Sequence, residues 1–189
     1  MHRYRVPVLL IATALCAPAF AHPGHGDSLA LGLLHPLSGI DHLLAMLGVG
    51  IWASMQAGRT RWLIPASFLA LMIVGAWIGV AGYAPLVTEL GVAASVAAIG
   101  MLNFRSVRVA PVVAMLLAGG FAVFHGFAHG SEMSVTGALP FGAGFLLSSA
   151  ALQLTGFWAG MLTRRNGRIA AMGGAAIAAC GALLMMQTL

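Results

Sequence analysis

Six long apolar segments joined by short polar loops restrict what this chain can fold into. A helix needs about 20 mainly apolar residues to cross the hydrocarbon core of a membrane. Only 7% of the residues are charged, whereas a soluble domain carries about 25%. We therefore predict an all-α integral membrane protein, a bundle of six transmembrane helices in the mature chain. The predicted spans are residues 29–56, 62–80, 84–102, 110–129, 136–162 and 169–189.

The first residues have the pattern of a secretory signal peptide. Arg3 and Arg5 give a positive start, residues 6–16 form a short apolar core, and residues 19–21 read Ala-Phe-Ala, a small-x-small cleavage site. We predict that residues 1–21 are removed. The alternative is that this segment stays attached as an uncleaved first helix.

Cleavage would expose a histidine-rich leader at residues 22–28, ahead of the membrane domain at residues 29–189. Its new amino terminus would be His22, with His25 and Asp27 close behind. Short histidine-rich tracts often bind metals. We predict that His22 and His25 assist metal capture on the periplasmic side, with a flexible polar leader as the alternative.

The arginines predict the orientation of the bundle. The chain has no lysine, and all arginines after the signal lie in three alternate loops. Positively charged loops stay in the cytoplasm, so both mature termini are predicted to be periplasmic in a multi-pass protein of the bacterial inner membrane. The net charge of +5 therefore indicates topology and no nucleic-acid partner. The loop arginines are Arg59, Arg61, Arg105, Arg108, Arg164, Arg165 and Arg168.

Two histidines and a carboxylate follow one another at helical spacing near the end of the fourth span. Residues three or four apart share one face of a helix. His125, His129 and Glu132 therefore form one stripe if the helix continues that far. The alternative is a pair of histidines that only pack between helices.

The first span carries a second group, made of His35, Asp41 and His42. On a continuous helix His35 and His42 are two turns apart and nearly share a face. We expect the spanning helix to begin at Pro36, because proline is best tolerated in a first turn, with residues 29–34 at the interface or re-entrant. Asp41 could be a direct ligand, a partner that orients a histidine, or a clamp between helices.

These groups all lie on the predicted periplasmic side, where they form a chemically coherent set. A charged residue at the bilayer centre costs about 2.5–3.5 kcal/mol, and no lysine or nearby arginine neutralises Asp41. A bound cation would compensate. Imidazole and carboxylate ligands suit Ni²⁺, Co²⁺, Zn²⁺ and Cu²⁺ without choosing among them. The predicted metal ligands are His35, Asp41, His42, His125, His129 and Glu132.

Small and polar residues inside the spans predict how the helices pack. Glycines four apart allow close backbone approach, as in Gly75/Gly79, Gly126/Gly130 and Gly156/Gly160. The fifth span contains several polar residues, for which we expect interhelical hydrogen bonds, with a polar path through the membrane as the alternative. These residues are Ser148, Ser149, Gln153 and Thr155.

Two motifs resemble those of the HupE/UreJ family. Residues 35–42 read HPLSGIDH and match HPxxGxDH, and residues 124–132 read FHGFAHGSE and match FHGxAHGxE. The start His-Pro-Gly-His at residues 22–25 is also similar. The resemblance covers the whole chain and implies a permease for nickel, sometimes cobalt, that supplies hydrogenase or urease maturation. It also implies that the four histidines and two carboxylates of the two motifs bind the transported metal.

The predicted function is therefore secondary uptake of Ni²⁺, or Co²⁺, as a transported substrate, with no prosthetic group and no enzymatic activity. The chain has no Walker motif, so ATP hydrolysis by this chain is not expected. The predicted partners are the metal ion, the lipid bilayer and hydrogenase or urease accessory proteins. Two alternatives remain: an intramembrane metal-dependent hydrolase and a metal-binding accessory protein that transports nothing.

Overall fold

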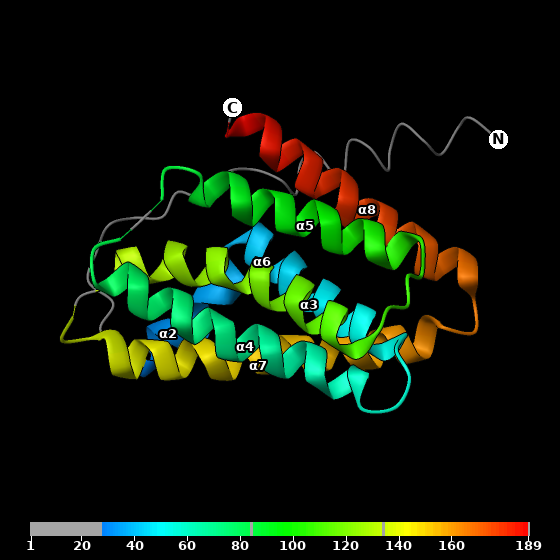
Figure 1. The fold of residues 1–189 in the computed structure, drawn as a ribbon, viewed down its shortest axis with the longest axis horizontal. Helices are drawn as coiled ribbons and strands as arrows, with labels where there is room; N and C mark the ends of the chain where they lie inside the picture. Colours follow the sequence, from blue (N-terminus) through cyan, green and yellow to red (C-terminus); the bar gives the residue numbers. More distant parts are fainter. Residues whose placement is uncertain (1–27, 84, 134, 189) are drawn as a thin grey trace.

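The computed structural model describes residues 28–83, 85–133 and 135–188. This part of the chain forms seven helices and contains no strand, and most of the helices run along the long axis of the molecule (Figure 1). The predicted signal peptide and residues 22–27 of the leader, including His22 and His25, lie outside the described residues. The helices are α2 (Leu29–Ser38), α3 (Ile40–Ser54), α4 (Thr60–Val80), α5 (Thr88–Phe104), α6 (Pro111–Glu132), α7 (Ala138–Thr163) and α8 (Gly167–Gln187).

The structure does not confirm the predicted count of six membrane-crossing helices. Helices α4, α6, α7 and α8 are long and apolar enough, and α2 with α3 makes a fifth span if the bent pair counts as one. Helix α5 has 17 residues and rises only about 25 Å, less than the hydrocarbon core of about 30 Å. It starts later than expected because residues 85–87 form a turn, in which Pro85 O accepts from Thr88 N at 3.0 Å. The described chain is thus a multi-pass helical membrane protein with four to five candidate spans.

The first predicted span is broken at Gly39, where the helix axes of α2 and α3 meet at 85°. Gly39 has extended backbone angles, φ −97° and ψ 120°, while Pro36 remains inside α2. The expected start of the spanning helix at Pro36 is therefore wrong by four residues, because α3 begins at Ile40. The expectation that His35 and His42 share a face of one helix is also wrong, because the bend lies between them.

The residues around Gly39 explain why the break occurs there. The first amides of a helix have no partner within it. Asp41 Oδ1 accepts from the backbone N–H of His42 at 2.7 Å and so satisfies one of these amides in α3. A Cβ on Gly39 would lie only 2.8 Å from this oxygen. A glycine followed two residues later by a carboxylate therefore favours a new helix start at this point.

The helices pack closely in pairs through glycines. Helix α4 packs along α6, α5 along α8, and α3 along α7. A Cβ on Gly126 of α6 would lie 2.8 Å from the Gly75 Cα of α4, and one on Gly79 would lie 2.9 Å from the Gly130 Cα. Real side chains do not fit at these distances, which confirms the close backbone approach predicted for the two glycine pairs. Helix α6, which carries two of the motif histidines, is thereby held against α4.

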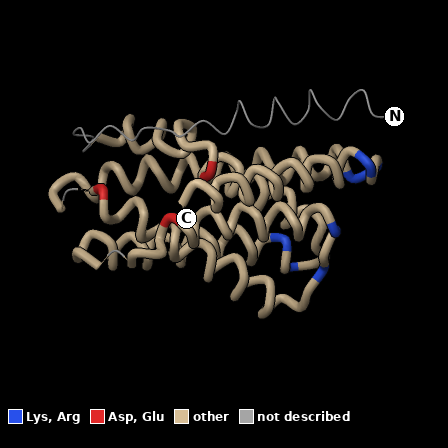
Figure 2. Tube along the Cα trace, turned by 90° about the horizontal axis from the view of Figure 1, so that it is seen from above, with Lys and Arg blue, Asp and Glu red and all other residues tan. Residues whose placement is uncertain are grey.

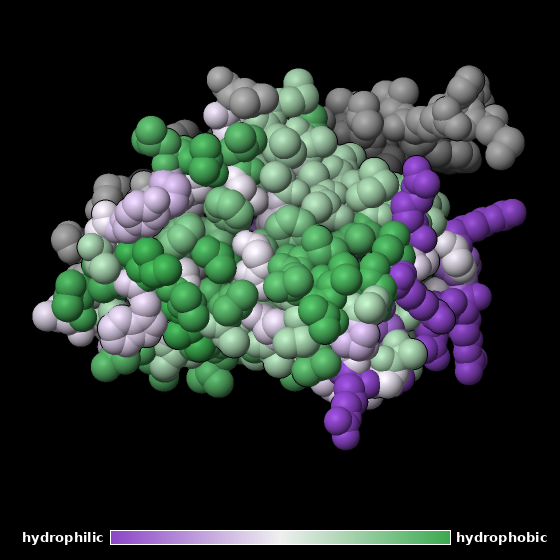
Figure 3. All heavy atoms as spheres, viewed as in Figure 1, coloured by the Kyte–Doolittle hydropathy of each residue, from purple (hydrophilic) through white to green (hydrophobic). Residues whose placement is uncertain are grey.

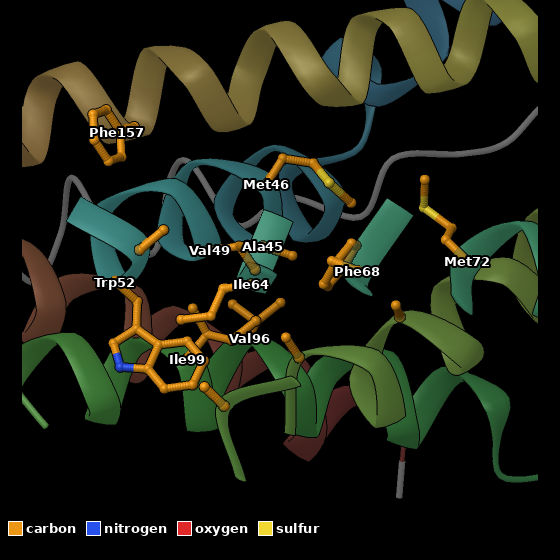
Figure 4. Close-up of a cluster of buried hydrophobic side chains, with 14 of the residues drawn as sticks. Ala45, Met46, Val49, Trp52, Ile64, Phe68, Met72, Val96, Ile99 and Phe157 are labelled. Atoms are coloured by element: carbon orange, nitrogen blue, oxygen red, sulfur yellow. The ribbon is translucent and has the colours of Figure 1, made fainter. Parts of the chain in front are cut away.

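The surface and the core have the polarity expected of a protein in lipid. Large side chains such as Trp52 and Phe68 fill the interior (Figure 4), while Leu116 and Trp158 are more than half exposed. Apolar residues cover much of the face drawn in Figure 3, and the most hydrophilic residues on that face gather at one end. Side chains this apolar are stable on an outer face when that face contacts lipid.

Charge is separated along the molecule. The loop arginines lie together at one end, which we call the arginine end, and the described acidic residues lie in the opposite half (Figure 2). Three loops supply these arginines, because α3, α5 and α7 all finish at this end (Figure 1). The acidic half contains both histidine motifs.

Candidate metal site

Three buried histidines from two helices lie against one another in the acidic half of the bundle. The ring of His129 on α6 packs edge-on against that of His42 on α3, with centroids 4.1 Å apart, and the ring centroids of His42 and His125 lie 4.6 Å apart. All three residues are at most 6% exposed. We call His42, His125 and His129 the histidine cluster.

His42 is oriented by the residue before it. Its Nδ1 lies 2.9 Å from Asp41 Oδ1, the oxygen that also accepts from the His42 backbone. A carboxylate only accepts hydrogen bonds when ionised, so Nδ1 carries the proton and Nε2 keeps a free lone pair. Nε2 is buried and has no hydrogen-bond partner among the described residues. Asp41 thus has the geometry of the orienting partner, one of the roles left open by the sequence.

His125 is oriented by a residue outside both motifs. Its Nε2 lies 2.7 Å from Ser95 Oγ of α5, and the Ser95 hydroxyl also lies 2.7 Å from Val92 O. A hydroxyl has one proton to donate. If Ser95 donates to Val92 O, it must accept from His125 Nε2–H, which leaves a lone pair on Nδ1. That nitrogen is buried and lacks a partner in the described part of the chain.

His129 connects the cluster to a second group of ligands nearer the surface. Its Nδ1 lies 3.9 Å from Glu132 Oε2, and His35 Nε2 lies 3.7 Å from the same oxygen. One donor atom from each of His35, His129 and Glu132 lies within 4.8 Å of the other two. We call these three residues the outer triad. His129 belongs to both groups, and neither of its ring nitrogens has a hydrogen-bond partner among the residues described.

The spacing of the outer triad is close to that of a metal site. Two donor atoms about 2.1 Å from one ion can be at most about 4.2 Å apart. Both distances to Glu132 Oε2 already meet this limit. The widest separation exceeds this upper limit by at most about 0.6 Å, so the side chains would have to move closer together to share one ion. The Glu132 side chain is half exposed, so the triad is open to an arriving ion.

Aromatic side chains of α7 pack against the histidine cluster and the outer triad. The ring of Phe145 lies 4.2 Å from that of His129 and contacts His42 as well, and Phe141 lies 5.3 Å from His35. An apolar shell excludes water and strengthens electrostatic interactions with a bound ion. Glycine allows this approach, because a Cβ on Gly32 of α2 would lie 3.0 Å from Phe145 N.

The structure brings together all six predicted ligands, although the helices that carry them are arranged differently from the prediction. His125, His129 and Glu132 share the single helix α6, while His35 and His42 converge on His129 from the two sides of the Gly39 bend. Asp41 pairs with His42. The sequence reasoning missed Ser95 and Phe145. Ser95 could have been recognised from the sequence, since a hydroxyl in the middle of an apolar span needs a hydrogen-bond partner.

Fold and site together define a class: a polytopic α-helical membrane protein with three histidines buried between its helices and a half-exposed carboxylate, Glu132, beside them. The chain belongs to the HupE / UreJ protein family, which it matches over residues 9–184. It is 37% identical over 188 residues to Protein HupE of Rhizobium leguminosarum bv. viciae, and the match covers 96% of this chain and 97% of the relative. No solved structure matches the chain.

Proposed function

We propose that this protein is a secondary permease that carries Ni²⁺, or Co²⁺, across the bacterial inner membrane toward the cytoplasm. The metal serves hydrogenase or urease maturation, as the family resemblance implies. The histidine cluster carries the proposal. Four ring nitrogens of His42, His125 and His129 are buried without hydrogen-bond partners among the described residues. Unpaired polar groups at this depth are costly, and a coordinated ion would satisfy the one free lone pair on each of the three imidazoles.

The arrangement suits an ion that passes through better than one held permanently. The outer triad is partly exposed, and the histidine cluster behind it is buried. His129 contacts both groups and can transfer an ion between them. A closed structural site would instead surround its metal with four fixed ligands.

The direction of transport follows from charge. Placing the arginine end in the cytoplasm opens the outer triad to the periplasm, where His22 and His25 would gather metal. The membrane potential then favours entry of a divalent cation by about 4.6 kcal/mol per 100 mV. Imidazole and carboxylate do not select nickel by affinity, since copper binds such sites more tightly. The choice of nickel therefore rests on the family resemblance.

Accumulation of radioactive nickel by cells that express the protein tests this function. The inactive variant is His42→Ala with His129→Ala. The matched control is Thr155→Val on α7, where the Thr155 hydroxyl donates to Ala151 O of its own helix. We expect uptake by wild type and control, competition by cobalt, and loss in the double variant. If wild-type protein in the membrane accumulates no more nickel than empty cells, the permease function is wrong and an accessory or hydrolytic role is favoured.

A further inference from the structure

A polar stripe on α7 continues from the histidine cluster toward the arginine end. Phe145, Ser149 and Gln153 are spaced four apart and therefore share one face of the helix. Phe145 contacts His42 and His129. Ser149 and Gln153 lie one and two turns further, about 6 Å and 12 Å along the axis. Beyond them α7 ends at Thr163, beside the first of the α7–α8 loop arginines.

Both polar side chains of this stripe are buried with unused oxygen atoms. Ser149 is fully buried and Gln153 is 2% exposed. Ser149 Oγ and Gln153 Oε1 have no hydrogen-bond partner within the part of the chain that the structure describes. A buried polar group without a partner costs about 1–3 kcal/mol. Two such groups on one face of a membrane helix therefore indicate that a polar ligand binds there transiently.

Met46 connects the stripe to the metal cluster. It follows His42 by one turn on α3, and its side chain lies in the core between α3 and α7 (Figure 4). Its Sδ accepts from Gln153 Nε2 at 3.5 Å. This contact occupies the amide nitrogen and leaves Oε1 as the free end of the side chain. The Gln153 oxygen is therefore oriented by the helix that also carries His42.

We propose that Ser149 and Gln153 form a second cation station, deeper than the histidine cluster, on the path by which the metal reaches the arginine end. The station takes a partly hydrated divalent transition-metal ion through neutral oxygen atoms. Neutral ligands suit this position, because a conducting site must bind an ion strongly enough to admit it and weakly enough to release it. This inference rests on the proposed permease function.

The first test separates binding from movement. Gln153→Leu with Ser149→Ala removes both oxygens, and Thr155→Val is the matched control on the same helix. We expect the maximal rate of nickel uptake to fall about tenfold in the double variant, while purified protein still binds nickel at the histidine cluster with wild-type affinity. A maximal rate equal to that of the control overturns the inference. So does a joint loss of rate and of nickel affinity, since the two residues would then only support the cluster.

A second variant tests the station even if the first does not insert. Gln153→Glu places a carboxylate at the same point, so purified protein should bind one more equivalent of Ni²⁺ than wild type, with slower uptake because release is harder. An unchanged stoichiometry in a folded Gln153→Glu protein contradicts the station. Absence of uptake by both wild type and Thr155→Val would instead refute the permease function, a result distinct from loss of uptake in the Gln153 and Ser149 variants alone.

Discussion

Replacing Ser95 by alanine should weaken metal binding although Ser95 lies in neither motif. The Ser95 hydroxyl lies 2.7 Å from both His125 Nε2 and Val92 O. Because its one proton goes to Val92 O, it accepts the proton of Nε2 and leaves Nδ1 ready to coordinate. In Ser95→Ala that Nε2–H group loses its acceptor in a fully buried position.

The size of the effect follows from these contacts. A buried donor without an acceptor costs about 1–3 kcal/mol. The imidazole can avoid part of this cost by rotating or by moving its proton to Nδ1, and either change removes the lone pair from the cluster. Removal of a partner that orients a ligating histidine typically lowers metal affinity about 10–100-fold. We expect a loss in this range for Ni²⁺.

Calorimetric titration of detergent-purified protein with Ni²⁺ measures this loss. Ser54→Ala is the matched control, because Ser54 is also a buried helical serine whose hydroxyl donates to the carbonyl three residues earlier, Ile51 O, at 2.7 Å. No hydrogen bond from Ser54 to a histidine is present in the described structure. Ser54→Ala should bind Ni²⁺ like wild type, and Ser95→Thr, which keeps a hydroxyl, should recover part of the lost affinity.

Equal affinities for Ser95→Ala and Ser54→Ala would refute the reasoning. That result would mean either that His125 does not coordinate the metal or that its tautomer is set by another group. Thermal unfolding of the same proteins separates a local effect from a general loss of stability. An affinity loss that disappears once unfolded protein is removed would refute the orienting role as well.

The structure also predicts the effect of two other substitutions, one on stability and one on nickel affinity. Gly126→Ala should lower the free energy of unfolding by about 1–3 kcal/mol, because the new Cβ would lie 2.7 Å from Ala76 N. Thermal unfolding in detergent measures this loss of stability. Gly120→Ala is the control and should lose no stability, because nothing lies within 4 Å of its new Cβ. Asp41→Asn should lower Ni²⁺ affinity about 10–100-fold in the same titration, because a neutral amide orients His42 less strongly. Unchanged affinity would show that the Asp41 charge does not act on the site.

Much of the architecture could be predicted from the sequence because the bilayer restricts the solutions. Long apolar segments must be helical in lipid, since each backbone group needs an internal partner. The stripe of His125, His129 and Glu132 was predictable for the same reason: regular spacing on one helix translates directly into position. The structure confirms that α6 continues through Glu132.

Two features were predicted at the wrong place, the break in the first span and the start of α5. Both depend on competition between neighbouring residues. Pro36 is the stronger helix breaker in isolation, yet the break falls at Gly39, where extended backbone and the Asp41 carboxylate together start a new helix. Helix α5 is shorter than its apolar run predicts because of the turn at Pro85. Propensity alone does not rank such local alternatives.

By itself, then, the sequence determined the membrane class, the helical framework, the separation of charge and the family to which the chain belongs. Only the tertiary structure decided that His129 joins the outer triad to the histidine cluster, that Asp41 orients His42, and that Ser95 orients His125. The physical reason is that spacing along one helix is set by backbone geometry. Contacts between helices depend instead on where glycines let backbones meet and on the angle of the Gly39 bend.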